Sequence, residues 1–237
     1  SVTAKARVFR AMERDYENYT KSVRLVMQEA QRGNLKNIHG PVSRLIRTED
    51  DYTLAIEIAL GAAMQQIVVG TENDGKAAIS YLKRTGGGRA TFLPMNTIQG
   101  RSLQESGLEH CRGFVGIASE LVSCDARYRG IVENLLGRTV IASDMDAAIQ
   151  MSQKYKNRFK IVTLDGQVMN PGGSMTGGSV NKDAGILSRA NELEKLTAQE
   201  KQLQQDRMVC EANLQEAQRQ YDQVEFQLAA ARDQLRE

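Results

Sequence analysis

Both ends of the 237-residue chain carry apolar side chains that recur every seven residues. A sustained apolar repeat of this period leaves a stripe along one face of a helix, and another helix must cover it. The repeat therefore predicts two coiled-coil arms, residues 1–36 and 188–237, around a central body at 37–187. The first arm's repeat holds Val2, Phe9, Tyr16, Val23 and Ala30, with Met12, Tyr19 and Val26 between them. The second arm holds Leu193, Leu214, Tyr221, Leu228 and Leu235 in one register, and Leu196, Leu203, Cys210, Ala217, Val224 and Ala231 in the other.

The two arms are predicted to pair with each other as an antiparallel coiled coil. They are joined through one body, which makes their association effectively intramolecular. Residues 1–36 hold eight Lys or Arg against four Asp or Glu, and residues 187–237 hold seven against ten, so the arms attract weakly. The second arm is the longer, and its surplus has no partner in the sequence. With Ser1 in place of an initiator Met, we expect a fragment of a longer coil-bearing protein.

Composition favours a soluble cytoplasmic protein with one ordinary domain core between the arms. No run approaches the roughly 18 apolar residues of a membrane span, and no signal peptide is apparent. Cys111, Cys124 and Cys210 are odd in number and lack metal-ligand spacing, which is typical of a reducing compartment. A net charge of +2 and an aromatic content of 5% indicate neither strong nucleic-acid binding nor a base-stacking platform.

The body is predicted to contain one helix and strand unit twice, which implies a pseudo-symmetric α/β fold. Ala77, Ala78 and Ile79 recur as Ala147, Ala148 and Ile149. In the first copy we expect a helix over 48–60, a strand over 67–69, a helix over 76–83 and a strand over 90–93. In the second we expect a helix over 128–136, a strand over 139–142, a helix over 144–155 and a strand over 159–164.

Residues 70–77, with the sequence GTENDGKA, nearly match a Walker A phosphate loop, and the IVTLD of 161–165 resembles a Walker B strand. The Walker A pattern ends in Ser or Thr because the hydroxyl coordinates magnesium, whereas Ala77 has no hydroxyl. The carboxylates of Glu72 and Asp74 would repel a triphosphate. We therefore predict no nucleotide hydrolysis here and keep a phosphate-loop hydrolase only as a minor alternative.

No catalytic residue, metal ligand or cofactor site is predicted. His39 and His110 are the only histidines, and nothing marks either as a base beside a nucleophile. Residues 170–179 hold four glycines in ten positions, a density that permits close approach of backbone. This segment is either a long turn that leads back to the coil or a surface against which another backbone packs.

Taken in order, several segments resemble the hinge domain of structural maintenance of chromosomes (SMC) proteins from bacteria. They are IHGPV at 38–42, AIEIALG at 55–61, GRATFLP at 88–94, ASELV at 118–122, NLLG at 134–137 and NPGGSMTGG at 170–178. The resemblance covers residues 37–190 and includes the coils on both sides. It implies a non-enzymatic α/β body of two subdomains, inserted in an antiparallel coiled coil, that joins two chains as a homodimer.

The resemblance also implies what the full-length protein does and which residues pair. The full-length protein would be a nucleoid-associated ATPase for chromosome condensation and segregation, with kleisin-type subunits at heads outside this sequence. Sheet extension across a dimer axis requires unobstructed backbone. By position, the interface residues are Gly172, Gly173, Gly177 and Gly178, with Gly88, Arg89 and Thr91 on the opposing surface.

Weak, non-specific DNA contact is a further implication, because family hinges touch DNA through basic residues near the coil junction. Asp183 opposes Lys182 here, so the charge cluster is thin, and ordinary solvated charges explain these residues equally well. Any contact with phosphates would depend on salt. A DNA-binding module with incidental dimerisation is the alternative function. The candidate residues are Lys36, Arg44, Arg47, Lys182 and Arg189.

Overall fold

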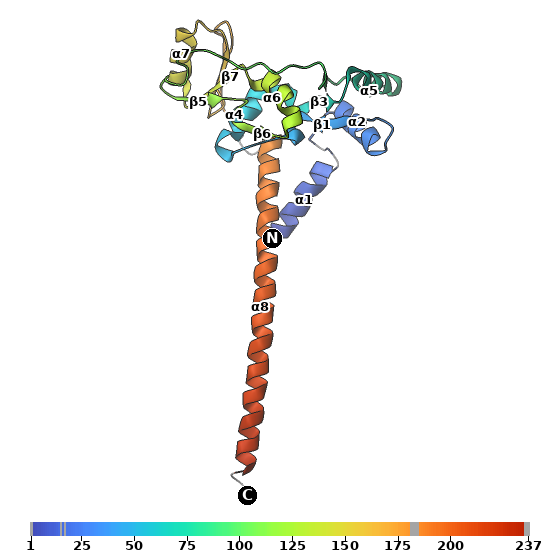
Figure 1. Cartoon of the computed structure of the whole chain (residues 1–237), viewed down its shortest axis with the longest axis vertical. Coiled ribbons are helices and arrows are strands. Elements are labelled where there is room, and N and C mark those ends of the chain that lie inside the picture. The colour runs from blue at the N-terminus through green and yellow to red at the C-terminus, as the bar shows by residue number, and fades with distance from the viewer. Residues whose placement is uncertain (1, 15, 17, 181–184, 235–237) are drawn as a thin grey trace. The chain divides into compact units, whose positions relative to one another are not determined.

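The computed structural model describes residues 2–14, 16, 18–180 and 185–234 of the chain (Figure 1). By contacts between residues, the chain divides into two compact units. One unit is an arm made from the two ends, Ser1–Val8 and Leu193–Glu237, and the other is a body, Phe9–Glu192. None of the described helices has the length and apolarity needed to cross a membrane.

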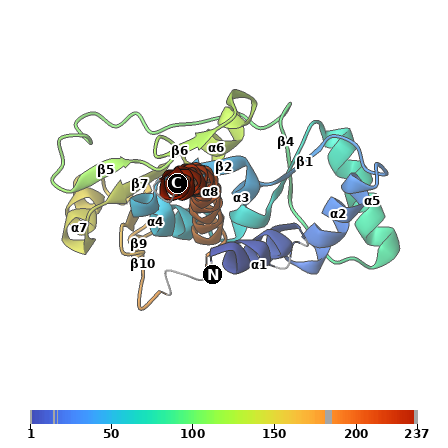
Figure 2. The ribbon, with the colours of Figure 1, turned by 90° about the horizontal axis from the view of Figure 1, so that it is seen from below.

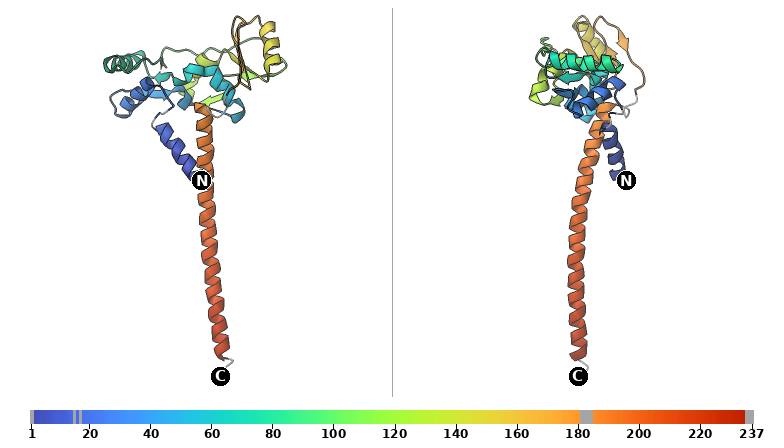
Figure 3. Two further views of the ribbon diagram at one scale, coloured as in Figure 1. Left: turned by 180° about the vertical axis from the view of Figure 1, so that it is seen from behind. Right: turned by 90° about the vertical axis from the view of Figure 1, so that its right-hand side faces the viewer.

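The arm is dominated by α8 (Ile186–Gln234), one uninterrupted helix (Figure 3). The start of α1 (Val2–Arg14) belongs to the same unit, and Ala6 is fully buried. On α8, Leu193 and Leu196 are also buried, whereas later seam residues such as Leu203 and Leu214 are exposed. The predicted pairing of the two arms is therefore present over a short stretch, and the described residues leave the rest of the α8 seam uncovered.

The predicted first arm over residues 1–36 is wrong beyond its first turns. Helix α1 ends at Arg14, and α2 (Lys21–Gln31) starts a separate helix. Between them Tyr16 adopts a φ of 54°, which a continuous helix excludes. The repeat positions Tyr16, Tyr19, Val23 and Val26 are buried against β3 and α5 of the body instead of in a coil seam. By contacts the compact body runs from Phe9 to Glu192 and is wider than the 37–187 predicted for the central domain.

The first half of the body holds a three-stranded sheet in the order β1-β3-β4. Strand β1 (Ile38–Pro41) runs antiparallel to β3 (Ile67–Val69), which runs parallel to β4 (Phe92–Pro94). Helix α5 (Glu72–Thr85) makes the crossover that a parallel pair requires. All three residues of β3 are buried, as expected for a central strand made of β-branched residues.

The second half repeats this arrangement in a five-stranded sheet with the order β10-β9-β8-β7-β5. Strand β5 runs antiparallel to β7, β7 runs parallel to β8, and α7 (Met145–Lys154) connects that parallel pair. The predicted internal repeat is therefore confirmed as a shared topology. The strands are β5 (Phe114–Ile117), β7 (Thr139–Ala142), β8 (Lys160–Thr163), β9 (Val168–Met169) and β10 (Met175–Thr176).

A small antiparallel pair and one shared core hold the two halves together. Strand β2 (Ile46–Thr48) of the first half pairs with β6 (Val122–Cys124) of the second. Figure 2 shows α2 and α5 at one end of the body and α7 at the other, with α4 and α6 between them. Buried Ile56, Leu136 and Leu187 belong to the core at the centre. The remaining elements are α3 (Val42–Leu45), α4 (Asp50–Leu60), η1 (Gly61–Gln65), η2 (Ala126–Tyr128) and α6 (Arg129–Leu136).

Candidate functional site

The glycine-rich segment forms the hairpin between β9 and β10, at one edge of the five-stranded sheet. Gly172 and Gly173 make the turn with φ values of 86° and 95°, which favour glycine. The Gly172 amide donates to the Asn157 carbonyl at 2.9 Å, and the Gly173 amide donates to the Asn170 carbonyl at 3.0 Å. The hairpin is therefore an ordered edge, and its Met175 side chain is 56% exposed.

The pairing register determines which backbone groups of β10 are free. Thr176 faces Val168, and the Asn170 amide donates to the Ser174 carbonyl at 2.8 Å, so Ser174 and Thr176 direct their backbone groups towards β9. Backbone groups alternate in direction along a strand. Met175 and Gly177 therefore direct their amides and carbonyls away from the sheet. Such a free edge is a template for pairing with another strand.

A second free edge lies along β4 and the residues before it. The Ile67 amide donates to the Thr91 carbonyl at 2.9 Å, and the Ser22 hydroxyl donates to the Arg89 carbonyl at 2.7 Å. By the same alternation, Ala90 and Phe92 point their backbone groups outwards. Pro94 has no amide hydrogen and ends this edge. Of the predicted residues here, Arg89 and Thr91 are exposed, and Gly88 adopts a φ of 88°.

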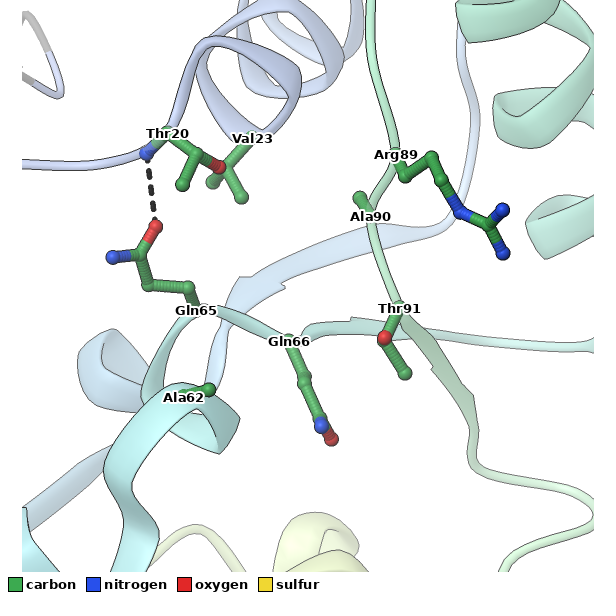
Figure 4. Close-up of a pocket in the computed structure, with 8 residues that line it drawn as sticks. All are labelled: Thr20, Val23, Ala62, Gln65, Gln66, Arg89, Ala90 and Thr91. Carbon is green, nitrogen blue, oxygen red and sulfur yellow. Dashed lines mark hydrogen bonds between the residues drawn. The ribbon is translucent and has the colours of Figure 1, made fainter.

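A groove of about 320 Å³ lies beside this second edge (Figure 4). Its walls mix apolar and polar side chains, and the Thr20 amide donates to the Gln65 side-chain oxygen at 2.8 Å across it. The groove gives a partner room to approach the backbone of Ala90. The lining residues are Thr20, Val23, Ala62, Gln65, Gln66, Arg89, Ala90 and Thr91.

The four predicted interface glycines are required for different reasons. Among the described residues, a Cβ added at Gly172 or Gly178 would meet no atom within 4 Å, whereas one at Gly177 would lie 2.1 Å from the side-chain oxygen of Gln167. A Cβ at Gly173 would make ordinary contact with Asn157 at 3.4 Å. The space at Gly172 and Gly178 is thus open towards solvent, while Gly177 makes room for a side chain of its own subunit.

Two of the predicted DNA-binding residues, Arg44 and Arg189, contact neighbouring residues Tyr16 and Asn18, and a third, Arg47, contacts the backbone of Arg44. The Arg44 guanidinium lies 4.4 Å from the centre of the Tyr16 ring, and Arg189 donates to the Asn18 side-chain oxygen. Arg47 donates to the Arg44 carbonyl at 3.4 Å and to the carbonyl of Ile46 at 2.7 Å, which places it beside Arg44. Lys36 is exposed. Lys182 lies outside the described residues.

The loop that resembles a phosphate-binding loop is the N-terminal cap of α5. Thr71 and Asp74 form a reciprocal capping box, and the hydrogen bond from Thr71 lowers the pKa of Asp74. Thr97 and Asn96 donate to Glu72 and lower the pKa of that carboxyl group. Ionised carboxylates therefore occupy the place where a nucleotide phosphate would bind.

In the described part of the chain, the two histidine rings contact Tyr128 and Glu109. His39 Nδ1 lies 3.1 Å from the Tyr128 hydroxyl in a contact between the two halves of the body. Burial, followed by repulsion from Arg127, lowers the pKa of His39, whereas Asp74 acts in the opposite direction. Exposed His110 pairs with Glu109 at 3.1 Å. Among the described residues, no group of three or more His, Cys, Asp or Glu side chains is arranged to hold a metal ion.

Two polar side chains that sequence reasoning missed fix the start of α8. Glu57 on α4 is buried, and its Oε1 accepts hydrogen bonds from the amides of Leu187 at 2.6 Å and Ser188 at 3.1 Å. Burial raises the pKa of Glu57, opposed by these hydrogen bonds and by Arg189. The side-chain amide of Asn191 donates to the Thr48 carbonyl at 3.0 Å and to the Thr53 hydroxyl at 3.1 Å. In the sequence, the signal for a special role of Glu57 is that it is a single Glu within the otherwise apolar run at 55–60.

Two topologically equivalent half-domains with two free sheet edges and a long emerging helix define a domain suited to joining chains. Residues 35–152 match the family model described as the SMC proteins flexible hinge domain. The chain is 43% identical over 199 residues to the chromosome partition protein Smc of Bacillus subtilis, covering 82% of this chain and 16% of that protein.

Solved structures give the same assignment. The chain is 41% identical to the SMC hinge domain of Geobacillus stearothermophilus, with a TM-score of 0.81 over 86% of this chain and 83% of that one. The Pyrococcus furiosus SMC hinge domain is 28% identical, with a TM-score of 0.58 over 76% of this chain and 90% of that one. The chain belongs to the SMC hinge family. It spans about a sixth of the length of the curated Bacillus subtilis relative, 16%.

Proposed function

We propose that the chain is the homodimerisation hinge of a bacterial SMC chromosome partition protein. The observation that carries this proposal is the solved Geobacillus stearothermophilus hinge, which is an asymmetric dimer and is 41% identical to this chain. The free edges in the present structure supply a contact of the right kind. One copy offers the backbone groups of Met175 and Gly177, and the other offers those of Ala90 and Phe92.

The proposed contact extends one sheet with another across the interface. The five-stranded sheet of one copy ends at β10, and the three-stranded sheet of the other ends at β4, so joining these edges makes a continuous sheet. Each copy carries both edges, so a two-fold dimer would use the same pair of patches twice. This closure satisfies edges that would otherwise recruit strands without limit.

Sedimentation equilibrium of the wild-type chain tests this function. A chain of 26.3 kDa is expected to sediment with twice that mass at micromolar concentration. The dimer is expected to persist at high salt because backbone hydrogen bonds and apolar contacts carry it. A single species of monomer mass over the whole concentration range would reject the proposed function.

We propose a weak DNA contact as a second function, which is favoured by Arg44 and Arg189 beside Tyr16 and Asn18 and by exposed Arg47 on the Arg44 backbone. We expect fluorescence anisotropy with a duplex DNA to show binding that weakens steeply as the salt concentration rises from about 50 to about 200 mM. Arg47→Ala removes one exposed cation and should lower the salt slope by about one. Arg138→Ala, an exposed arginine on the turn before β7, is the control. Equal slopes for Arg47→Ala and the wild type would contradict the assignment.

Functions of the full-length protein lie outside this chain and are also proposals. The Bacillus subtilis relative is a chromosome partition protein of which this chain matches a sixth. We infer ATP hydrolysis and binding of kleisin-type subunits at distal heads, with the assembly on the nucleoid in the cytoplasm. The hinge itself takes no part in the chemistry, and no cofactor is assigned to it.

A further inference from the structure

The side-chain amide of Gln167 makes the pair of backbone hydrogen bonds that a neighbouring strand would make. Its Oε1 accepts a hydrogen bond from the Gly178 amide at 2.8 Å, and its Nε2 donates to the Gly178 carbonyl at 3.2 Å. Both backbone groups of one residue are thus paired by a single side chain. A second donor contact, from Nε2 to the Asp165 carbonyl at 3.4 Å, orients the amide.

The register of the hairpin explains why a side chain is needed at this place. Thr176 faces Val168, so the next inward-facing residue, Gly178, would face Gly166. Gly166 lies in a turn, with a φ of 88° and its amide bonded to the Thr163 carbonyl at 2.9 Å. Backbone of β9 is therefore not available for a further pair of hydrogen bonds. The Gln167 amide supplies that pair and carries the ordered edge past the end of β10.

We propose that Gln167 is a positioning residue for dimerisation, because it holds the 175–178 edge in the geometry that a second copy needs. This inference rests on the proposed function. Gly177 presents its free backbone groups between Thr176 and Gly178, which are both anchored on the inner side. Without the Gln167 bonds, the inner side of Gly178 loses its partners and the outward edge frays at Gly177. A frayed strand must become ordered when a partner binds, and the conformational entropy lost in this step lowers the affinity of the dimer.

Gly177 provides an independent observation that points to the same role. Its φ is not positive, so an L-residue fits the backbone at this position. The three atoms nearest to a Cβ here all belong to Gln167, with Oε1, Cδ and Cβ at 2.1, 3.2 and 3.8 Å. Any side chain at 177 therefore displaces the Gln167 amide. The absence of a side chain at Gly177 therefore leaves room for Gln167 of the same chain. The sequence-based expectation was that this glycine leaves room for the backbone of the partner.

A double-mutant cycle tests the inference on the dimer of the wild-type chain. Gln167→Ala and Gly177→Ala are each expected to raise the dissociation constant about tenfold, which corresponds to about 1.4 kcal/mol. The double variant is expected to match either single variant within about threefold, because Gly177 matters through Gln167. Gln153→Ala, an exposed glutamine on α7, is the control and should leave the constant unchanged.

Hydrogen exchange at the Gly178 amide gives a readout that does not depend on association. In dilute, monomeric samples Gln167→Ala should exchange this amide at least tenfold faster than the wild type, with the β8 amides unchanged. An unaltered dissociation constant in Gln167→Ala, or fully additive effects in the double variant, would overturn the role of Gln167 while leaving the dimer proposal intact. A wild type that never associates would overturn both.

Discussion

Gly172→Gln combined with Gly178→Gln is expected to convert the dimer into monomers, with a dissociation constant raised at least about a hundredfold. Within one subunit a Cβ at either position meets nothing within 4 Å, so the added side chains have room in the monomer. In the proposed dimer they occupy the space through which the other backbone approaches. A hundredfold change corresponds to about 2.7 kcal/mol, a cost that overpacking of one contact can reach.

Backbone strain must be separated from the loss of contact, because both glycines have positive φ, 86° and 142°. An L-residue in such a conformation costs about 1–2 kcal/mol wherever it occurs. Gly33 is the matched control, since its φ is 80° and a Cβ there also meets nothing. Gly33→Gln should lower stability by the cost of one such position, about half that of the double variant, and leave the dimer intact. Sedimentation at matched concentrations measures both, and a dimeric Gly172→Gln, Gly178→Gln variant would remove these glycines from the interface.

Glu57→Ala is expected to destabilise the body by about 2 kcal/mol, because it leaves two amides at the start of α8, one of them buried, without their acceptor. The amides of Leu187 and Ser188 lose their bonds to the carboxylate. Urea denaturation at neutral pH measures the effect. Glu120→Ala, at an exposed turn, is the control. An unchanged urea midpoint for Glu57→Ala would show that Glu57 does not hold α8.

The pH dependence of Glu57→Gln follows from the raised pKa of the carboxyl group. A carboxyl whose pKa is higher in the folded state binds a proton more readily there, so its stabilising contribution is complete below the unfolded value of about 4.5. That contribution is lost as pH rises through the folded pKa. The wild type should therefore lose stability relative to Glu57→Gln between pH 4.5 and neutral pH. If the wild type instead gained stability relative to Glu57→Gln as the pH rises, the two hydrogen bonds from the amides would lower the pKa of Glu57 by more than burial raises it.

The sequence predicted best those elements whose signal is local. Residues 67–69 and 139–142 are β-branched or apolar runs that became the buried strands β3 and β7. The helix predicted to stop at Gly61 does so, because Gly61 adopts a φ of 51°. Helix α5 starts at Glu72, four residues before the predicted start, because the Thr71 capping box satisfies its first amides.

Elements that depend on distant partners escaped prediction. Strands β9 and β10 have two residues each, which is too short for an alternating apolar pattern to be recognised in the sequence. They pair because the glycine turn between them brings them together. The seven-residue repeat at Tyr16, Tyr19 and Val23 indicated a helix that needs a cover but did not say which surface covers it. The body core does so, and the expected arm is correspondingly shorter.

The candidate site was predicted in outline and not in mechanism. The glycine density of 170–179 left both a long turn and a surface for close approach open, and the segment forms a hairpin whose strand β10 lies at the edge of the sheet. Contact of a partner with this edge stays a prediction. No local pattern predicted that Gln167 would pair with Gly178, because the partners are 11 residues apart and meet only through the register of the hairpin. Glu57 likewise acts on residues 130 and 131 positions later.

Cysteine crosslinking between differently tagged copies tests the central claim most directly. Cys111, Cys124 and Cys210 are first replaced by Ser, after which one copy carries Ala90→Cys and the other Met175→Cys. Oxidation of the mixture should give a disulfide between the two tags, whereas a mixture of two Ala90→Cys copies should give little. Crosslinks that form equally well in both mixtures, or in neither while the chain remains dimeric, would contradict pairing of the β10 edge with the β4 edge.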